Sequence, residues 1–138
     1  MYYMEFDTKI KVILRNDLYA WQELNVTAFL MSGIAGTQNI IGEPYQDADN
    51  VTYLPMSQQP IMILSADKDT LREVLKKALS REMAVSIYTE ELFTTYNDAD
   101  NRAEVRKHKT DELNLVGIAI RGTKNPVDRI TKGIEMHK

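Results

Sequence analysis

The sequence predicts an α/β fold, a three-layer α/β/α sandwich around a mixed sheet of about four strands. Short apolar runs recur at residues 9–14, 61–64, 84–88 and 115–120, and longer segments between them carry the apolar spacing of helices. Such alternation is typical of a sheet covered by helices on both faces. At 138 residues and 43% apolar content, the chain is expected to form a single domain over residues 1–138.

The first strand and the first helix are predicted from the N-terminal part of the chain. Residues 9–14 alternate polar with apolar side chains and end in Val12-Ile13-Leu14, and residues 15–17 follow as a loop. Residues 20–35 have a helical pattern that is apolar on nearly all sides, which predicts burial on more than one face. Because this segment is rich in small residues, a homodimer through the helix from Trp21 to Gly36 is the alternative to packing within the core.

Residues 36–60 have no strong periodicity, and a structureless loop of that length is unusual in a compact domain. A short strand at Val51–Leu54, after an Asp47–Asn50 turn, is expected to form an arm or flap. The strand that pairs with it is not evident from the sequence.

A β-α-β unit is predicted in the middle of the chain. Residues 61–64 form a continuous apolar run, as expected for a central strand, and Asp67 can cap the helix that follows at about 68–81. That helix has the clearest amphipathic pattern in the chain, and the next strand spans 84–88. The two strands should be parallel with a right-handed crossover.

The C-terminal third is expected to add two helices and a fourth strand. Asn97 or Asp98 can cap a helix at about 99–108, and the strand follows at 115–120. In the final helix, Asn125 and Pro126 are expected to supply the cap and the first helical position, ahead of a narrow apolar stripe. The stripe consists of Val127, Ile130 and Ile134.

Composition excludes several classes of function. The chain has no cysteine, so disulfides, thiolate zinc sites and cysteine nucleophiles are excluded and a reducing compartment is permitted. No apolar stretch is long enough to span a bilayer, and residues 1–11 lack a signal pattern, so we expect a cytoplasmic protein without membrane association. A net charge of −3 argues against general nucleic-acid binding.

Three segments carry a resemblance to a known class of enzymes. They are Val12–Leu18, Gln59–Tyr88 and Leu115–Gly133, which together cover most of the chain. They resemble the type II peptidyl-tRNA hydrolases, and the resemblance implies that fold. Four further segments resemble an uncharacterised bacterial family, the domain of unknown function number 2000, which looks like a branch of the same fold. These segments are Trp21–Leu30, Glu43–Tyr45, Tyr88–Phe93 and Asn97–Arg102.

The sequence departs from the hydrolases where their activity resides. Their lysine-containing stretch at the start of the first helix reads Ala20–Leu24 here, and their aspartate-containing turn after the third strand reads Thr89–Thr95. The resemblance therefore implies the fold and withholds the activity. The leading hypothesis is a hydrolase-like protein acting on a small or tRNA-linked ester or amide. The competing hypothesis is a non-catalytic module that binds a small molecule or a partner protein.

The candidate site is predicted beyond the carboxyl ends of the parallel strands, where ligands of open α/β sheets usually bind. Asp17 or Glu90 could act there as a general base, and Arg15 could stabilise an oxyanion or phosphate. The alternative is that these charges only shape the turn or pair with each other. The expected ligand-binding side chains are Arg15, Asn16, Trp21, Gln22, Asn25, Thr89 and Glu91.

Two further groups of residues could contribute to ligand binding. Asn101 and Arg102, in the first turn of their helix, could face an anionic ligand. Trp21 with Tyr19, Tyr88 and Phe93 could form an aromatic floor, although packing is the usual role of such residues. No metal site, cofactor or histidine-based triad is predicted, because His108 and His137 are far apart and no Gly-rich phosphate loop occurs.

One observation separates the two hypotheses. A catalytic site should place a carboxylate with a raised pKa in a cleft, whereas a binding module should have an aromatic pocket with its carboxylates paired.

Overall fold

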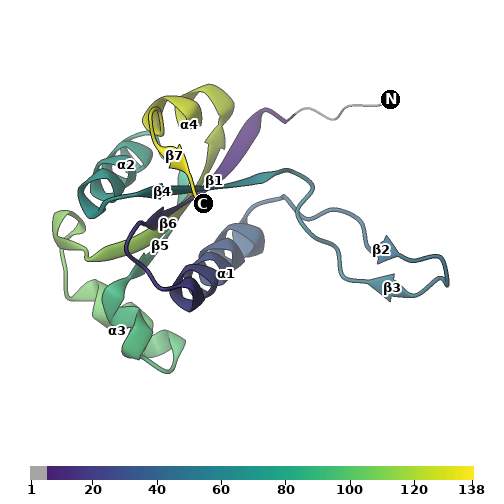
Figure 1. The fold of residues 1–138 in the computed structure, drawn as a ribbon, viewed down its shortest axis with the longest axis horizontal. Helices are drawn as coiled ribbons and strands as arrows, with labels where there is room; N and C mark the ends of the chain where they lie inside the picture. Colours follow the sequence, from purple (N-terminus) through teal and green to yellow (C-terminus); the bar gives the residue numbers. More distant parts are fainter. Residues whose placement is uncertain (1–5) are drawn as a thin grey trace.

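The computed structural model describes residues 6–138 (Figure 1). Its elements, in chain order, are β1 (Thr8–Arg15), α1 (Ala20–Thr37), β2 (Tyr45–Gln46), β3 (Thr52–Tyr53), β4 (Ile61–Ala66), α2 (Lys68–Ser80), β5 (Ala84–Thr89), the 3-10 helix η1 (Glu90–Thr94), α3 (Asp98–Arg106), the 3-10 helix η2 (Thr110–Glu112), β6 (Leu115–Thr123), α4 (Lys124–Ile130) and β7 (Glu135–Met136).

The main sheet is mixed and has five strands in the order β5-β6-β1-β4-β7. Strands β1 and β4 pair in parallel, whereas β6 is antiparallel to both β1 and β5, and β7 is antiparallel to β4. The α/β class and the mixed sheet are therefore as predicted, and the expected four strands become five. The added strand, β7, has two residues, too short for any apolar period to reveal it.

The predicted β4-α2-β5 unit is correct in direction, but its strands are not neighbours. β5 is antiparallel to β6, which is antiparallel to β1, which is parallel to β4, so β4 and β5 run the same way with two strands between them. The adjacent parallel pair is β1 and β4, whose connection contains α1 and the β2–β3 hairpin.

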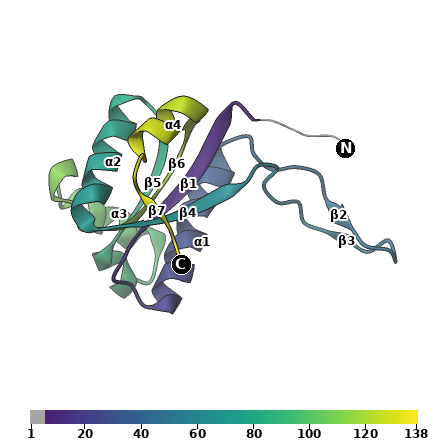
Figure 2. The same ribbon diagram turned by 45° about the horizontal axis from the view of Figure 1, so that its top comes forward.

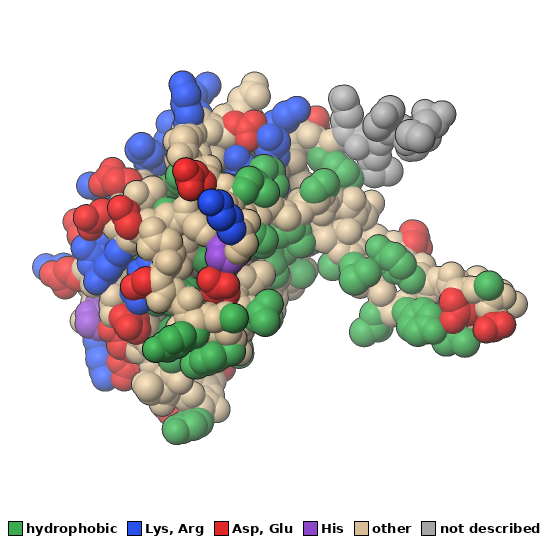
Figure 3. Space-filling view, viewed as in Figure 1, with side chains coloured by type: hydrophobic (Ala, Val, Ile, Leu, Met, Phe, Trp, Pro, Cys, Tyr) green, Lys and Arg blue, Asp and Glu red, His purple; other side chains and the backbone are tan. Residues whose placement is uncertain are grey.

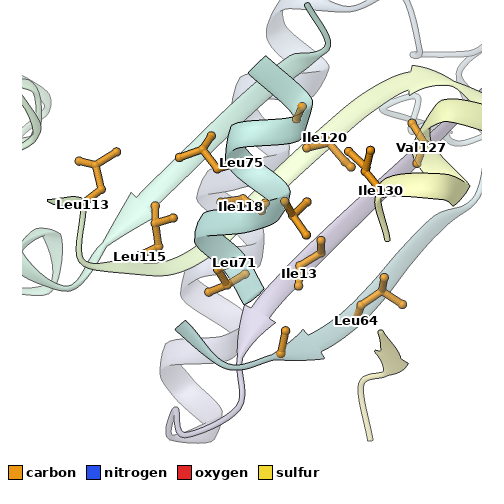
Figure 4. Packing of buried hydrophobic residues seen from close by; sticks show 13 residues of the cluster. Ile13, Leu64, Leu71, Leu75, Leu113, Leu115, Ile118, Ile120, Val127 and Ile130 are labelled. Atoms are coloured by element: carbon orange, nitrogen blue, oxygen red, sulfur yellow. The ribbon is translucent and has the colours of Figure 1, made fainter. Parts of the chain in front are cut away.

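Helices cover both faces of the sheet (Figures 1 and 2). On one face, Leu71 and Leu75 of α2 and Val127 and Ile130 of α4 pack on side chains such as Ile118 (Figure 4). On the other face, α1 buries the residues of one stripe against the sheet. The stripe is Val26, Leu30 and Ile34.

The prediction that α1 is buried on more than one face is wrong for this chain. Leu24 is 74% exposed and Phe29 is 53% exposed. Within residues 6–138, no element covers the outer side of the helix, and α3 with η1 only flanks it (Figure 1). Packing against the sheet therefore accounts for only one stripe of the apolar residues of α1.

Gly117 lets α1 approach the sheet closely. A Cβ atom at this position would lie 2.7 Å from Val26 Cγ1 and 3.1 Å from Leu30 Cδ1. These distances are shorter than van der Waals contact, so only glycine fits the present packing.

The segment at 41–57, here called the arm, is a hairpin that projects from the body (Figures 1 and 2). The strand predicted at Val51–Leu54 is β3, and its missing partner is β2, again only two residues long. Asp47 Oδ1 accepts hydrogen bonds from the N–H groups of Asp49 at 2.9 Å and Val51 at 3.0 Å, while Oδ2 accepts one from the Tyr53 hydroxyl at 2.7 Å. The turn predicted at 47–50 is confirmed.

Two helix starts can be compared with their predictions. Asn97 caps α3, because its Oδ1 accepts a hydrogen bond from the Asp100 N–H at 2.8 Å. It is one of the two caps predicted for this helix. The prediction for α4 is wrong by two residues, because Thr123 rather than Asn125 is its cap. Pro126 lies inside the first turn, where a residue without an N–H loses no helical hydrogen bond. Ile134, placed in the predicted stripe, lies beyond the helix end at Ile130.

Within the described part of the chain, no helix combines the length and hydropathy needed to cross a membrane.

Candidate functional site

The predicted site residues fall into two separate places. In β1, Ile13 packs with the α2 side of the core and Leu14 with the α1 side, so alternation puts Arg15 on the α2 side. In β5, Tyr88 packs with the α1 side. The site expected as one pocket is therefore a charged group at the sheet edge and an aromatic cleft on the α1 side.

The charged group is built from the ends of β1 and β5. Arg15 Nε lies 2.6 Å from Asp17 Oδ1, and its NH1 lies 3.5 Å from Glu90 Oε2. Glu90 Oε2 also accepts a hydrogen bond from Asn114 Nδ2 at 2.8 Å. Both candidate general bases are thus paired, as expected for the alternative in which these charges fix the loops.

Arg15 and Glu91 have shifted pKa values, and neither shift favours acid–base chemistry. Burial alone would lower the pKa of Arg15, but the hydrogen bonds and charges of Asp17 and Glu90 raise it overall. Burial would raise the pKa of Glu91, yet its own backbone N–H, Thr89 and Asn114 lower it overall. Among the described residues, Glu91 Oε2 is buried without a direct hydrogen-bond donor. A carboxylate whose pKa is lowered stays ionised at neutral pH and is a weak base.

Three other predicted residues have local structural roles. The Asn16 N–H donates to the Ala66 carbonyl at 3.0 Å and joins the ends of β1 and β4. Gln22 Oε1 accepts a hydrogen bond from the Tyr19 N–H at 2.9 Å at the start of α1. Thr89 is buried at the end of β5.

The aromatic cleft lies between α1, the end of β5 and the segment from η1 to α3. Two adjoining cavities of about 380 Å³ and 540 Å³ share the side chains of Phe29, Tyr88 and Leu92 on one side and Asp98 and Asn101 on the other. The predicted residues Trp21, Asn25 and Arg102 also line it. Their combined volume is in the range of small-molecule sites.

Aromatic rings continue along the length of the cleft. The ring centroids of Trp21 and Phe93 are 5.6 Å apart in an edge-on arrangement, those of Phe93 and Tyr88 are 5.1 Å apart, and those of Tyr88 and Phe29 are 5.9 Å apart. Tyr96 lines the same cavity and is almost fully exposed. The rings contact each other at an angle, as aromatic pairs usually do.

Polar groups interrupt the aromatic lining at a few points. The Tyr88 hydroxyl donates to Asn25 Oδ1 at 3.3 Å, and burial raises the pKa of Tyr88, so its phenol stays protonated. Asn101 Oδ1 accepts a hydrogen bond from the Thr95 hydroxyl, and Arg102 pairs with Asp98.

Sequence reasoning missed Phe29, Tyr96 and Arg106 as lining residues. Phe29 could have been found, because Trp21, Asn25 and Phe29 are spaced by four residues and share one helix face. Arg106 carries the same signal, because it follows Arg102 by four residues in one helix. Tyr96 gave no such signal, since it lies in the connection between η1 and α3.

A hydrogen-bonded trio that sequence reasoning judged improbable is present at the C-terminal edge. The Ser65 hydroxyl bonds to His137 Nδ1, and His137 Nε2 lies 3.1 Å from Glu23 Oε2. The His137 N–H also donates to the Ile63 carbonyl at 2.9 Å. The trio fastens the C-terminal segment to β4 and α1, and none of its side chains lines the aromatic cleft.

No group of three or more potential metal ligands occurs within residues 6–138.

Comparisons with known proteins agree on the family and give no activity. The model of a family described as proteins of unknown function, DUF2000, matches residues 8–138. The solved structure of Atu0240, a protein of unknown function from Agrobacterium tumefaciens strain C58, is 48% identical with a TM-score of 0.92, and the match covers 97% of this chain and 100% of that one. A search of curated proteins gives no match.

Proposed function

The chain belongs to the DUF2000 family of proteins of unknown function, and we propose that it binds a small molecule with a planar ring in the aromatic cleft. The observation that carries this proposal is the continuous aromatic lining of the two adjoining cavities, from Trp21 to Phe29. The pairing of Asp17 and Glu90 also supports binding over catalysis, as a binding module should have no unpaired base.

The polar groups of the cleft define the ligand further. Tyr88 supplies a protonated phenol, and Asn101 Oδ1 is already bonded, which leaves the Asn101 amide nitrogen without an acceptor among residues 6–138. The charges of Asp98 and Arg102 offset each other, so Arg106 contributes the remaining positive charge at the rim. A neutral or anionic heteroaromatic compound with hydrogen-bond acceptors suits this lining.

The single tryptophan of the chain provides a direct assay. Because Trp21 lines the cleft, titration with adenosine or adenosine monophosphate should change its fluorescence in a saturable way, whereas ribose 5-phosphate, which has no aromatic ring, should not. Phe29→Ala should weaken binding about tenfold by removing one ring contact. The matched control is Leu79→Ala, which removes a half-exposed apolar side chain from α2 on the opposite face of the sheet. Equal responses to ribose 5-phosphate, or no response to either ring compound, would contradict the proposal.

A second candidate function is hydrolysis of a small or tRNA-linked ester or amide. It is supported by the resemblance to type II peptidyl-tRNA hydrolases, whose fold we propose for this chain, and by the proximity of Arg15, Asp17 and Glu90. The resemblance to the uncharacterised bacterial family supports a bacterial protein, and the absence of cysteine supports a cytoplasmic one. The test is release of tRNA from N-acyl-aminoacyl-tRNA. Activity that Asp17→Asn or Glu90→Gln abolishes would favour hydrolysis, and release no faster than in buffer would remove this substrate.

A further inference from the structure

The arm exposes an unusually large apolar surface. Along residues 41–57, Leu54 is 86% exposed and five other large apolar side chains are at least 40% exposed. These five are Ile41, Tyr45, Val51, Tyr53 and Met56. The six side chains present on the order of 700 Å², whereas the largest apolar patch of a typical monomer is about 300–600 Å². Figure 3 shows these side chains along the projecting arm, with acidic groups at its far end.

The arm is built to hold its shape away from the body. Asp47 fixes the turn, and the Gly42 N–H donates to the Met56 carbonyl at 2.9 Å near its base. Hydrogen bonds on both sides of the turn and at the base keep the apolar side chains displayed rather than collapsed. A preformed surface of this kind loses little conformational entropy on binding.

The outer side of α1 is a second uncovered apolar surface. Trp21, Leu24 and Phe29 are each more than half exposed, and Ala28 and Ser32 between them are small enough to admit another backbone. Together with the arm, this surface amounts to roughly 1,100 Å² per copy, while a standard stable interface buries about 800 Å² per partner.

Charge indicates what kind of partner fits the arm. Residues 41–57 contain Glu43, Asp47 and Asp49 and no basic residue, so nucleic acids and anionic membranes would be repelled. The outer side of α1 carries no charge of its own, and in the cavity beside it Asp98 pairs with Arg102, which leaves Arg106. The apolar outer side of α1 is therefore a surface that the apolar side chains of the arm can contact without repulsion from unpaired carboxylates.

We propose that the chain forms a two-fold dimer in which the arm of each copy packs along the outer side of α1 in the other copy. In such an isologous contact both complementary surfaces are used twice, which covers all of the exposed apolar side chains described above. Trp21 and Phe29 belong both to this surface and to the aromatic cleft, so the dimer is tested without a ring ligand present.

Three single substitutions test the surfaces by sedimentation equilibrium. Leu54→Glu on the arm and Leu24→Glu on α1 should each raise the dimer dissociation constant at least tenfold. The matched control is Leu79→Glu, which places the same charge at a half-exposed leucine of α2 on the opposite face and should leave the dimer intact. Circular dichroism should show native helix content in all three.

Mixing the two defective variants distinguishes arm exchange from other dimers. A pair of one Leu54→Glu copy and one Leu24→Glu copy keeps one intact arm and one intact α1 surface in contact, so it should dimerise more tightly than either variant alone. A mixture as monomeric as its components would overturn arm exchange. A wild-type chain that stays monomeric at about 100 µM, well above the Kd of ordinary dimers, would overturn the dimer itself.

Discussion

Helices α1 and α2 pack on opposite faces of one sheet, yet their outer sides differ. α2 buries Leu71, Val74, Leu75 and Ala78, and its outer side is mostly charged. α1 buries a comparable stripe but contains one charged residue, Glu23, and exposes Trp21, Leu24 and Phe29.

The difference supports the proposal that the α1 face makes the contacts with other molecules. A helix that only covers a sheet needs a solvated outer side, and α2 has one. The outer side of α1 exposes apolar groups instead, and exposed apolar patches often mark binding surfaces. The ring-lined cleft and the proposed dimer surface both lie along this helix.

Truncation of a buried side chain should lower the free energy of unfolding by a similar amount in α1 and in α2. These truncations should have the largest effects. Leu71→Ala in α2 and Leu30→Ala in α1 each remove a fully buried side chain and should lower the free energy of unfolding by about 2–5 kcal/mol. Leu79→Ala, at a half-exposed position, should cost less than about 1 kcal/mol. Urea denaturation measures all three, and a small effect of Leu30→Ala would break the equivalence.

Replacing either of two glycines on the α1 side by alanine should change the stability, in opposite directions. Gly117→Ala should destabilise the protein by about 1–3 kcal/mol, because its Cβ would lie 2.7 Å from Val26 Cγ1. Gly36→Ala, near the end of α1, meets no atom within 4 Å and should stabilise by up to about 1 kcal/mol through helix propensity. Thermal unfolding of the two variants measures both stability changes. A Gly117→Ala variant as stable as the wild type would mean that α1 packs less closely on β6 than the structure shows.

The smallest effect on stability is expected for polar contacts on the face of the sheet that α2 and α4 cover. Buried Lys11 donates to Thr131 Oγ1 at 2.7 Å and lies 3.2 Å from Asp128 Oδ1, and Lys9 also bonds to Asp128. These lysines, Lys9 first, lower the pKa of Asp128, although burial opposes them. Because Asp128 is partly exposed, Asp128→Asn should cost less than about 1 kcal/mol at pH 7.

The pH dependence of that variant follows from the lowered pKa. A carboxyl whose pKa is lower in the folded state stabilises above its unfolded value near 3.8, and this contribution is lost as pH falls through the folded pKa. The stability difference between wild type and Asp128→Asn should therefore shrink from pH 6 to pH 3. A difference that stays constant over this range would exclude the ion pairs as its cause.

Prediction from sequence worked where a local pattern decides the structure. The apolar spacing of residues 71–78 and the cap at Asp67 gave α2 almost to the residue. Strands β2 and β7 could not be predicted, because each has two residues, too few for a pattern, and is a strand only through its pairing with β3 or β4. The apolar composition of α1 was read as internal burial, since a single sequence does not distinguish contacts within the chain from contacts with other molecules.

The candidate site was predicted in part. Trp21, Asn25, Asn101 and Arg102 line the cleft, as expected for ligand-binding residues. Arg15 and its carboxylate partners do not, because strand alternation turns Arg15 toward the α2 side. Successive side chains of β1 point to opposite faces of the sheet. Residues that had been grouped by their place near the strand ends therefore lie on different faces.

The central claim, that the α1 side binds a ring compound, is tested most directly by backbone amide NMR shifts during titration with adenosine and with adenosine monophosphate. The account predicts saturable shifts along the exposed side of α1 and in residues 88–106, with little change at Arg15 to Asp17 or in α2. Shifts centred on Arg15 to Asp17, or none with either compound, would contradict it.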